Sequence, residues 1–147
     1  MVKFAREKSV LVRDVMATDL LLVTVGTPLP EAAAMLAEWR ISGAPVVSRS
    51  GKPIGIVSRG DILDPRHQGV AHAVEDVMTR VLYAVRPGDT LVSAARLMTA
   101  EHIHRVLVAD EDGRLVGLVS AMDVVRVVAE SESHDAPLEY VQLGSST

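Results

Sequence analysis

Cysteine is missing from this 147-residue sequence, so disulfides, thiolate metal ligands and cysteine nucleophiles are excluded. Aromatic residues are scarce, at 3%, which argues against a protein that stacks the bases of single-stranded nucleic acid. The formal net charge is −4 and no basic run occurs. This balance argues against binding to nucleic-acid phosphates or to anionic membranes.

Long apolar runs are absent too. No stretch approaches the roughly 18 apolar residues that cross a bilayer, and the first residues, MVKFAREKSVLV, lack the apolar core of a secretory signal. We therefore expect a soluble, cytoplasmic protein with no nucleic-acid or membrane partner. The composition, 48% hydrophobic and 23% charged, is typical of a folded domain.

The chain contains a tandem repeat. GIVSRGD at 55–61 returns as GLVSAMD at 117–123, and DVM at 14–16 returns as DVM at 76–78. When the sequence is shifted by 62 residues, 17 of the 52 positions from 12 to 63 carry the same residue in both copies, without a gap. This self-similarity indicates a duplicated structural unit.

Each unit predicts the order β-α-β-β-α. Short apolar strands are expected at 20–25 and 82–85, Ala/Leu/Met-rich helices at 30–40 and 91–102, and then two strands around a polar turn. Because units of this size are marginal alone, we expect an α+β fold in which two repeats pack sheet to sheet, share one core and form a pseudo-two-fold module. The predicted divisions are an N-terminal segment 1–9, repeat 1 at 10–65, a linker 66–73, repeat 2 at 74–130 and a tail 131–147, in which 138–143 could add a strand or dock on a partner.

A Ser-x-x-Asp pair starts the last helix of each unit, at Ser58 and Asp61 and at Ser120 and Asp123. One interpretation is a binding site: a hydroxyl and free helix amides suit phosphate, and the carboxylate can accept hydrogen bonds from ribose hydroxyls. The glycines at 55 and 117 would then let a ligand approach the backbone. The other interpretation is a capping box, which needs no ligand. Both stay open, since the two roles are compatible.

The doubled pattern DVM…G…L-x-x-A…I-x-x-x-x-V…G-x-x-x-G-hydrophobic-V-S-x-x-D resembles a pair of CBS domains over roughly residues 10–130. The resemblance implies a regulatory module rather than an enzyme, with no catalytic cofactor. Many such modules are attached to enzymes, channels or transporters, but for this chain we expect no attached effector domain. It implies clefts for AMP, ADP, ATP or S-adenosylmethionine, in which Ser contacts phosphate or ribose and Asp holds the ribose. It also implies an effector protein as partner. The alternative is a ligand-free structural module that works by dimerisation and docking.

The two units differ where their central strand begins. The second has His104 and Arg105, which match a phosphate-contacting pair in nucleotide-sensing CBS modules; the alternative is a solvated edge. The first has no cation there. We therefore expect unequal sites, one of them favouring phosphorylated ligands. Further candidate ligand contacts are Gly43, Ala44 and Pro45, Val106, and Thr24 and Arg86 at the ends of the first strands. Met16 and Met78 either contact an adenine face or simply pack in the core.

His102 and His104 are too few ligands for a metal site, so we expect no bound metal. No catalytic motif is found either. The alanines at 32–34 and 94–95 permit close helix approach, which predicts a homodimer.

Overall fold

The computed structural model describes residues 9–80, 83–131 and 141–144. The first repeat contains β1 (Val23–Thr24), α2 (Leu29–Trp39), β2 (Gly43–Val47), β3 (Pro53–Ser58) and α3 (Arg59–Leu63). The second contains β4 (Ala84–Val85), α4 (Leu91–Glu101), β5 (Arg105–Ala109), β6 (Leu115–Ser120) and α5 (Ala121–Ser131). The predicted β-α-β-β-α order is confirmed in both, with first strands shorter than expected.

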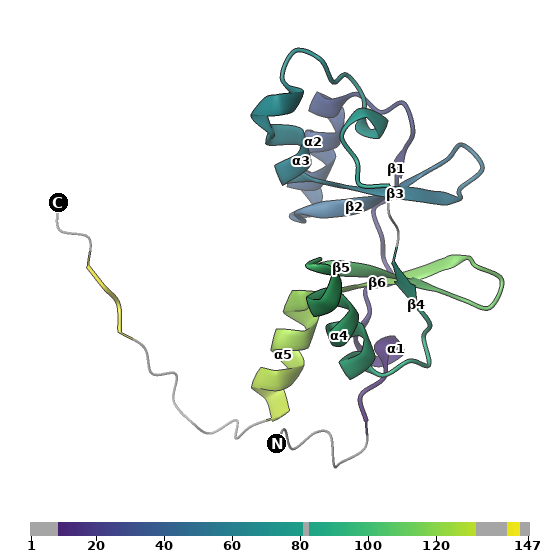
Figure 1. The fold of residues 1–147 in the computed structure, drawn as a ribbon, viewed down its shortest axis with the longest axis vertical. Helices are drawn as coiled ribbons and strands as arrows, with labels where there is room; N and C mark the ends of the chain where they lie inside the picture. The colour runs from purple at the N-terminus through teal and green to yellow at the C-terminus, as the bar shows by residue number, and fades with distance from the viewer. Residues whose placement is uncertain (1–8, 81–82, 132–140, 145–147) are drawn as a thin grey trace.

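Each repeat forms a three-stranded sheet, ordered β1-β2-β3 and β4-β5-β6. The first strand runs parallel to the second, and the second pairs antiparallel with the third through a hairpin. Glycine is required in both hairpin turns because Gly51 and Gly113 adopt φ of +88° and +78°, in the left-handed region. The two sheets lie next to each other in the middle of the molecule, with α2 and α3 outside one and α4 and α5 outside the other (Figure 1). The expected sheet-to-sheet packing is therefore confirmed.

The core is divided, which corrects the expectation of one shared core. Among the described residues, one apolar cluster lies around Leu36, Val46 and Val57 in the first repeat, and a second lies around Val106 and Val119 in the other. Strand side chains alternate between faces, so Pro45, Val47 and Leu107 point toward the space between the sheets, and all three are buried. A thin apolar layer therefore joins two separate cores.

The repeats exchange their leading segments. The short helix α1 (Val12–Val15) opens the first repeat in sequence, yet Val12 is buried in the core of the second. Its continuation pairs there, since Ala17 and Leu118 exchange two backbone hydrogen bonds of 2.9 and 3.0 Å. In the same way η3 (Val74–Asp76) packs in the core of the first repeat, and Thr79 pairs with Ile56 at 2.9 and 3.0 Å.

The exchanged segments explain the paired glycines of the repeat. A Cβ on Gly117 would lie 2.6 Å from Sδ of Met16, and a Cβ on Gly55 would lie 2.5 Å from Sδ of Met78. The prediction that these glycines admit a ligand is therefore wrong, because methionine side chains fill the space. Met16 and Met78 accordingly pack against the opposite repeat's sheet, which supports packing as their role.

The other connections follow simple local chemistry. Helix α4 is capped by Thr90, whose hydroxyl accepts a 3.1 Å hydrogen bond from the Ser93 amide. Helix α2 has no side-chain cap and instead has proline in its first turn. The linker contains η2 (Pro65–His67).

None of the helices in the described part of the chain combines the length and apolar character needed to cross a membrane. Residues 141–144 are exposed and carry no strand, while 138–140, the rest of the predicted docking segment, lie outside the described residues.

Replacing Gly117 with alanine is expected to lower the free energy of unfolding by about 1–3 kcal/mol, the usual cost of overpacking a core. The added methyl would meet Met16 and, at 3.1 Å, the carbonyl oxygen of Ala17. Chemical denaturation measures the change. Gly60→Ala is the matched control, because a Cβ at Gly60 has only an ordinary 3.7 Å contact with the Ser58 hydroxyl. Equal stabilities of the two variants would contradict this packing role.

Candidate functional site

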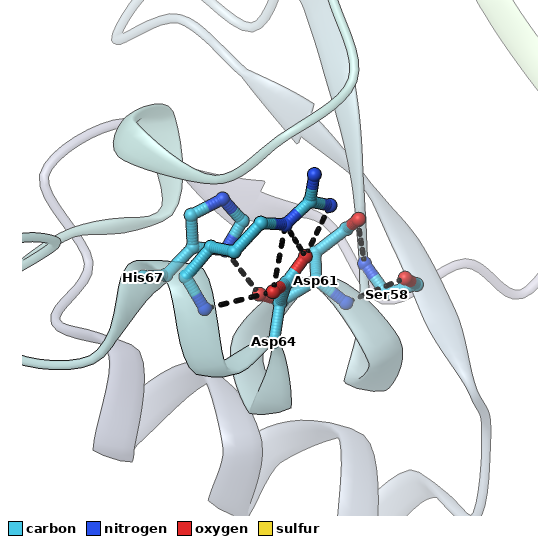
Figure 2. A network of polar contacts seen from close by, with 5 residues as sticks. Ser58, Asp61, Asp64 and His67 are labelled. Carbon is cyan, nitrogen blue, oxygen red and sulfur yellow. Dashed lines mark hydrogen bonds and ion pairs between the residues drawn. The ribbon is translucent and has the colours of Figure 1, made fainter.

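Both Ser-x-x-Asp pairs form capping boxes. At the start of α3 the Ser58 amide donates to Oδ2 of Asp61 at 2.9 Å, and the Asp61 amide donates to the Ser58 hydroxyl at 3.2 Å (Figure 2). At the start of α5 the equivalent distances between Ser120 and Asp123 are 2.8 and 3.3 Å. The box uses one carboxylate oxygen, so the other oxygen of each aspartate decides what else the residue can bind.

The second carboxylate oxygen has different surroundings in the two boxes. Oδ1 of Asp123 accepts a 3.0 Å hydrogen bond from the Arg126 guanidinium, one helical turn later. In the part of the chain that the structure describes, Oδ1 of Asp61 accepts no hydrogen bond. The first box therefore offers an acceptor that the second has already engaged.

Asp61 and Asp123 have different neighbours because α3 ends much earlier than α5. The residue equivalent to Arg126 is Asp64, at the end of the five-residue α3, and Pro65 follows it. Asp64 binds Arg66 instead, at 2.6 Å, and the hydrogen bonds from the Arg66 side chain and backbone lower the pKa of Asp64 to about 2. His67 also turns back, placing Nδ1 2.8 Å from the carbonyl oxygen of Asp61 (Figure 2). These contacts hold the short helix and its box without adding a cation beside Asp61.

A cavity of about 180 Å³ opens beside the first box and draws its walls from both repeats. Ser58 and Asp61 come from the first repeat, while His104 and Arg105 come from the start of β5 in the second. The structure thus brings together two motifs that the sequence repeat assigns to different units. The remaining lining residues are Ile56, Thr79, Tyr83, His102 and Ile103.

Arg105 crosses from the second repeat to the first. Its Nη2 donates a 2.6 Å hydrogen bond to the Ser42 hydroxyl. Partial burial lowers the pKa of the Arg105 guanidinium, and the carboxylate of Asp61 acts in the opposite direction. The cavity therefore combines a partly desolvated fork of N–H donors with carboxylate and hydroxyl acceptors, which suits a ligand that has both a phosphate and hydroxyl groups.

Several predicted contacts lie away from this cavity. Ala44 and Val106 point to the helix-covered faces of their sheets and are fully buried in the two cores, and Pro45 is buried between the sheets. Thr24 pairs with Val47, at the opposite end of β2 from the Gly43–Ser58 pair. Arg86 lies at the equivalent end of its own sheet and donates to the carbonyl oxygen of Asp110 at 2.8 Å. None of these residues lines this cavity, so their role as ligand contacts stays a prediction.

Tyr83, Thr79 and Ile56 are lining residues that sequence reasoning missed. The Tyr83 hydroxyl donates to Glu101 at 2.8 Å, and this hydrogen bond raises the pKa of Tyr83. Thr79 reaches the cavity through the exchanged segment, by pairing with Ile56. Of these three residues, only Ile56 could have been found from the sequence, because alternation along β3 places it on the same face as Ser58.

The CBS-domain family model matches residues 12–66 and 74–130. Among curated proteins, the chain is 30% identical over 122 residues to homoserine O-acetyltransferase of Methanohalobium evestigatum, covering 81% of this chain but only 24% of that enzyme. It is 26% identical over 153 residues to an uncharacterised protein of Methanocaldococcus jannaschii, covering 80% of this chain and 90% of that protein.

Two solved structures of similar shape contain bound ligands. The CBS domain pair of protein MJ0100, in complex with 5′-methylthioadenosine and S-adenosyl-L-methionine, superposes with a TM-score of 0.79 at 26% identity, covering 85% of this chain and all of that one. CBSX2 in complex with AMP superposes with a TM-score of 0.72 at 29% identity, covering 82% of this chain and 97% of that one.

Replacing Ser120 with alanine is expected to lower the free energy of unfolding by about 1 kcal/mol, because the Asp123 amide loses its capping acceptor. Chemical denaturation measures this loss. Ser131→Ala is the control at the other end of α5, where the hydroxyl only donates to the carbonyl oxygen of Val128. An S120A protein as stable as the wild type would show that the box does not hold the helix.

Proposed function

The chain belongs to the CBS-domain family, and on that premise we propose that it is a regulatory module that binds an adenine nucleotide or another adenosyl compound and passes its ligand state to a partner protein. AMP, ADP, ATP and S-adenosylmethionine are the candidate ligands. The relative named as an acetyltransferase is much longer than this chain, which matches 24% of its length. The proposal therefore gives the chain a regulatory role, with no catalysis and no catalytic cofactor.

The observation that carries the proposal is the cavity shared by the two repeats. Asp61 offers an acceptor for ribose hydroxyls, the Ser58 hydroxyl can donate, and Arg105 offers a planar fork for phosphate. His104 adds a further donor, and Ile56 supplies apolar surface for a base. The ligands in the structures of MJ0100 and CBSX2 all contain adenosine, which supports this class of ligand.

We propose that the two clefts are unequal. The cleft at Asp61 gains Arg105 and favours a phosphorylated ligand. The cleft at Asp123 has an aspartate already paired with Arg126 and neutral residues, Ser42 and Gly43, at the equivalent of the His104–Arg105 position. It therefore binds more weakly or takes an adenosyl ligand without phosphate.

Signalling follows from the shared cavity. A ligand that contacts Asp61 in one repeat and Arg105 in the other binds best in one relative arrangement of the two repeats. It stabilises that arrangement by its difference in affinity. An effector protein that recognises this arrangement would respond to the ligand, and we propose such a protein as the partner.

We also propose a homodimer that uses the second repeat's helices. Met122, Val125 and Val128 of α5 are 60%, 56% and 44% exposed. Beside them a groove lies between α4 and α5, with Ala95 in its wall. Burying this apolar surface against a second copy would remove it from water, the main favourable term in association.

A ligand-free structural module is the second candidate, because both capping boxes are complete without a ligand. In that case removing an aspartate would change stability alone. The two candidates are separated by a binding measurement on matched variants.

Wild-type protein titrated with AMP is expected to bind, and a hundredfold excess over the dissociation constant would stabilise it by about 2.7 kcal/mol. Asp61→Ala is expected to abolish binding because the ribose acceptor is lost. Asp123→Ala is the matched control: it loses an equivalent cap but leaves the Asp61 cleft intact. Isothermal calorimetry and thermal shift measure both effects. If no adenosine compound binds at millimolar concentration, the structural module is favoured.

The wild-type protein is expected to have a mass in solution of twice the 15.7 kDa chain. Val125→Asp is expected to give monomers, since a carboxylate would be buried unpaired in the interface. Val70→Asp is the control, because Val70 is 70% exposed in the linker. Light scattering after size exclusion measures the masses. A single-chain mass for the wild type at micromolar concentration would contradict the dimer.

A further inference from the structure

Gly43 and Arg105 occupy the same position in the two repeats, 62 residues apart. Each is the first residue of its central strand, and each pairs with the serine of its own capping box: Gly43 with Ser58, and Arg105 with Ser120. One repeat thus places a long cation at this position, and the other places no side chain at all.

The guanidinium of Arg105 occupies the space that a side chain at position 43 would fill. A Cβ on Gly43 would lie 2.9 Å from Nη1 and 3.0 Å from Cζ of Arg105. Gly43 is not among the residues with positive φ, so its backbone conformation does not require glycine. The residue is needed for space: any side chain would push the guanidinium away from its place over β2.

The position of the Arg105 guanidinium over β2 determines which cleft receives its positive charge. Arg105 starts beside Ser120, yet its guanidinium reaches Ser42 and lines the cavity with Ser58 and Asp61. By the symmetry of the two repeats, a cation for the other cleft would have to come from position 43, which has no side chain. Because position 43 is glycine and the equivalent position 105 is arginine, only the Ser58–Asp61 cleft receives a cation from this position.

We propose that Gly43 is a positioning residue that directs Arg105 into the Ser58–Asp61 cleft and so makes this cleft prefer AMP over adenosine. The inference rests on the proposed function and deepens it, because it names the chemical feature, a phosphate, on which the cleft discriminates. Gly43 acts only through Arg105, without touching the ligand.

Calorimetric titration with AMP and with adenosine tests the inference on wild-type protein, Gly43→Ala, Arg105→Gln and the double variant. The wild type is expected to bind AMP more tightly than adenosine. Each single variant is expected to weaken AMP binding by about tenfold or more, the loss of a charge-assisted hydrogen bond, while adenosine binding stays the same. The double variant is expected to lose no more than R105Q alone, because Gly43 has no role once the guanidinium is gone. Gly88→Ala, whose nearest neighbour would be 3.8 Å away, is expected to match the wild type.

The outcomes separate this inference from the proposed function. If the wild type binds neither AMP nor adenosine, the inference fails, and the proposed function fails with it only if ADP, ATP and S-adenosylmethionine do not bind either. If the wild type binds AMP and adenosine equally, or if G43A keeps the full preference for AMP, the inference alone is overturned. Additive losses in the double variant would also overturn it.

An exchange variant covers the case in which G43A does not fold. Gly43→Arg combined with Arg105→Gly keeps the composition and is expected to move the AMP preference to the other cleft. AMP binding by this variant should then be reduced by Asp123→Asn and not by Asp61→Asn, the reverse of the wild type. AMP binding that still depends on Asp61 would overturn the inference.

Discussion

Neither repeat covers its own sheet completely, and the rest of the structure depends on that constraint. The segment with Val12 and Met16 packs on the second sheet, and the segment with Val74 and Met78 packs on the first. Each repeat therefore buries apolar surface that belongs to the other. This exchange fixes the two sheets against each other, so that groups on the facing strands can meet in one cavity.

The cavity is asymmetric although the fold is nearly symmetric. The exchange treats both repeats alike, down to the glycine under each methionine. Asymmetry enters through a few positions at the strand starts and helix ends. Arg105 stands opposite Gly43, and Arg126 pairs with Asp123 while its counterpart Asp64 pairs with Arg66. Charge, rather than backbone shape, therefore distinguishes the two Ser-x-x-Asp boxes and their surroundings.

The Ser-x-x-Asp motif does not require a choice between a cap and a binding site. A capping box uses one oxygen of the aspartate and the acceptor side of the serine hydroxyl. In the first repeat the second oxygen of Asp61 accepts no hydrogen bond from the described residues, and Asp61 lines the same cavity as Arg105. The same two residues can therefore start the helix and present acceptors to a ligand, with little rearrangement on binding.

The sequence by itself determined the duplication, the β-α-β-β-α order, the two hairpins and the Ser-x-x-Asp boxes at 58–61 and 120–123, because each depends on local periodicity, turn residues or capping chemistry. It also singled out His104 and Arg105. Only the tertiary structure decided that Arg105 lines one cavity with Asp61 and that methionines pack against the glycines at 55 and 117. It also decided that Thr24 and Arg86 lie at the ends of their sheets away from this cavity. These facts depend on which segments the repeats exchange and which strand ends meet. Contacts between residues tens of positions apart set both, and no local pattern records them.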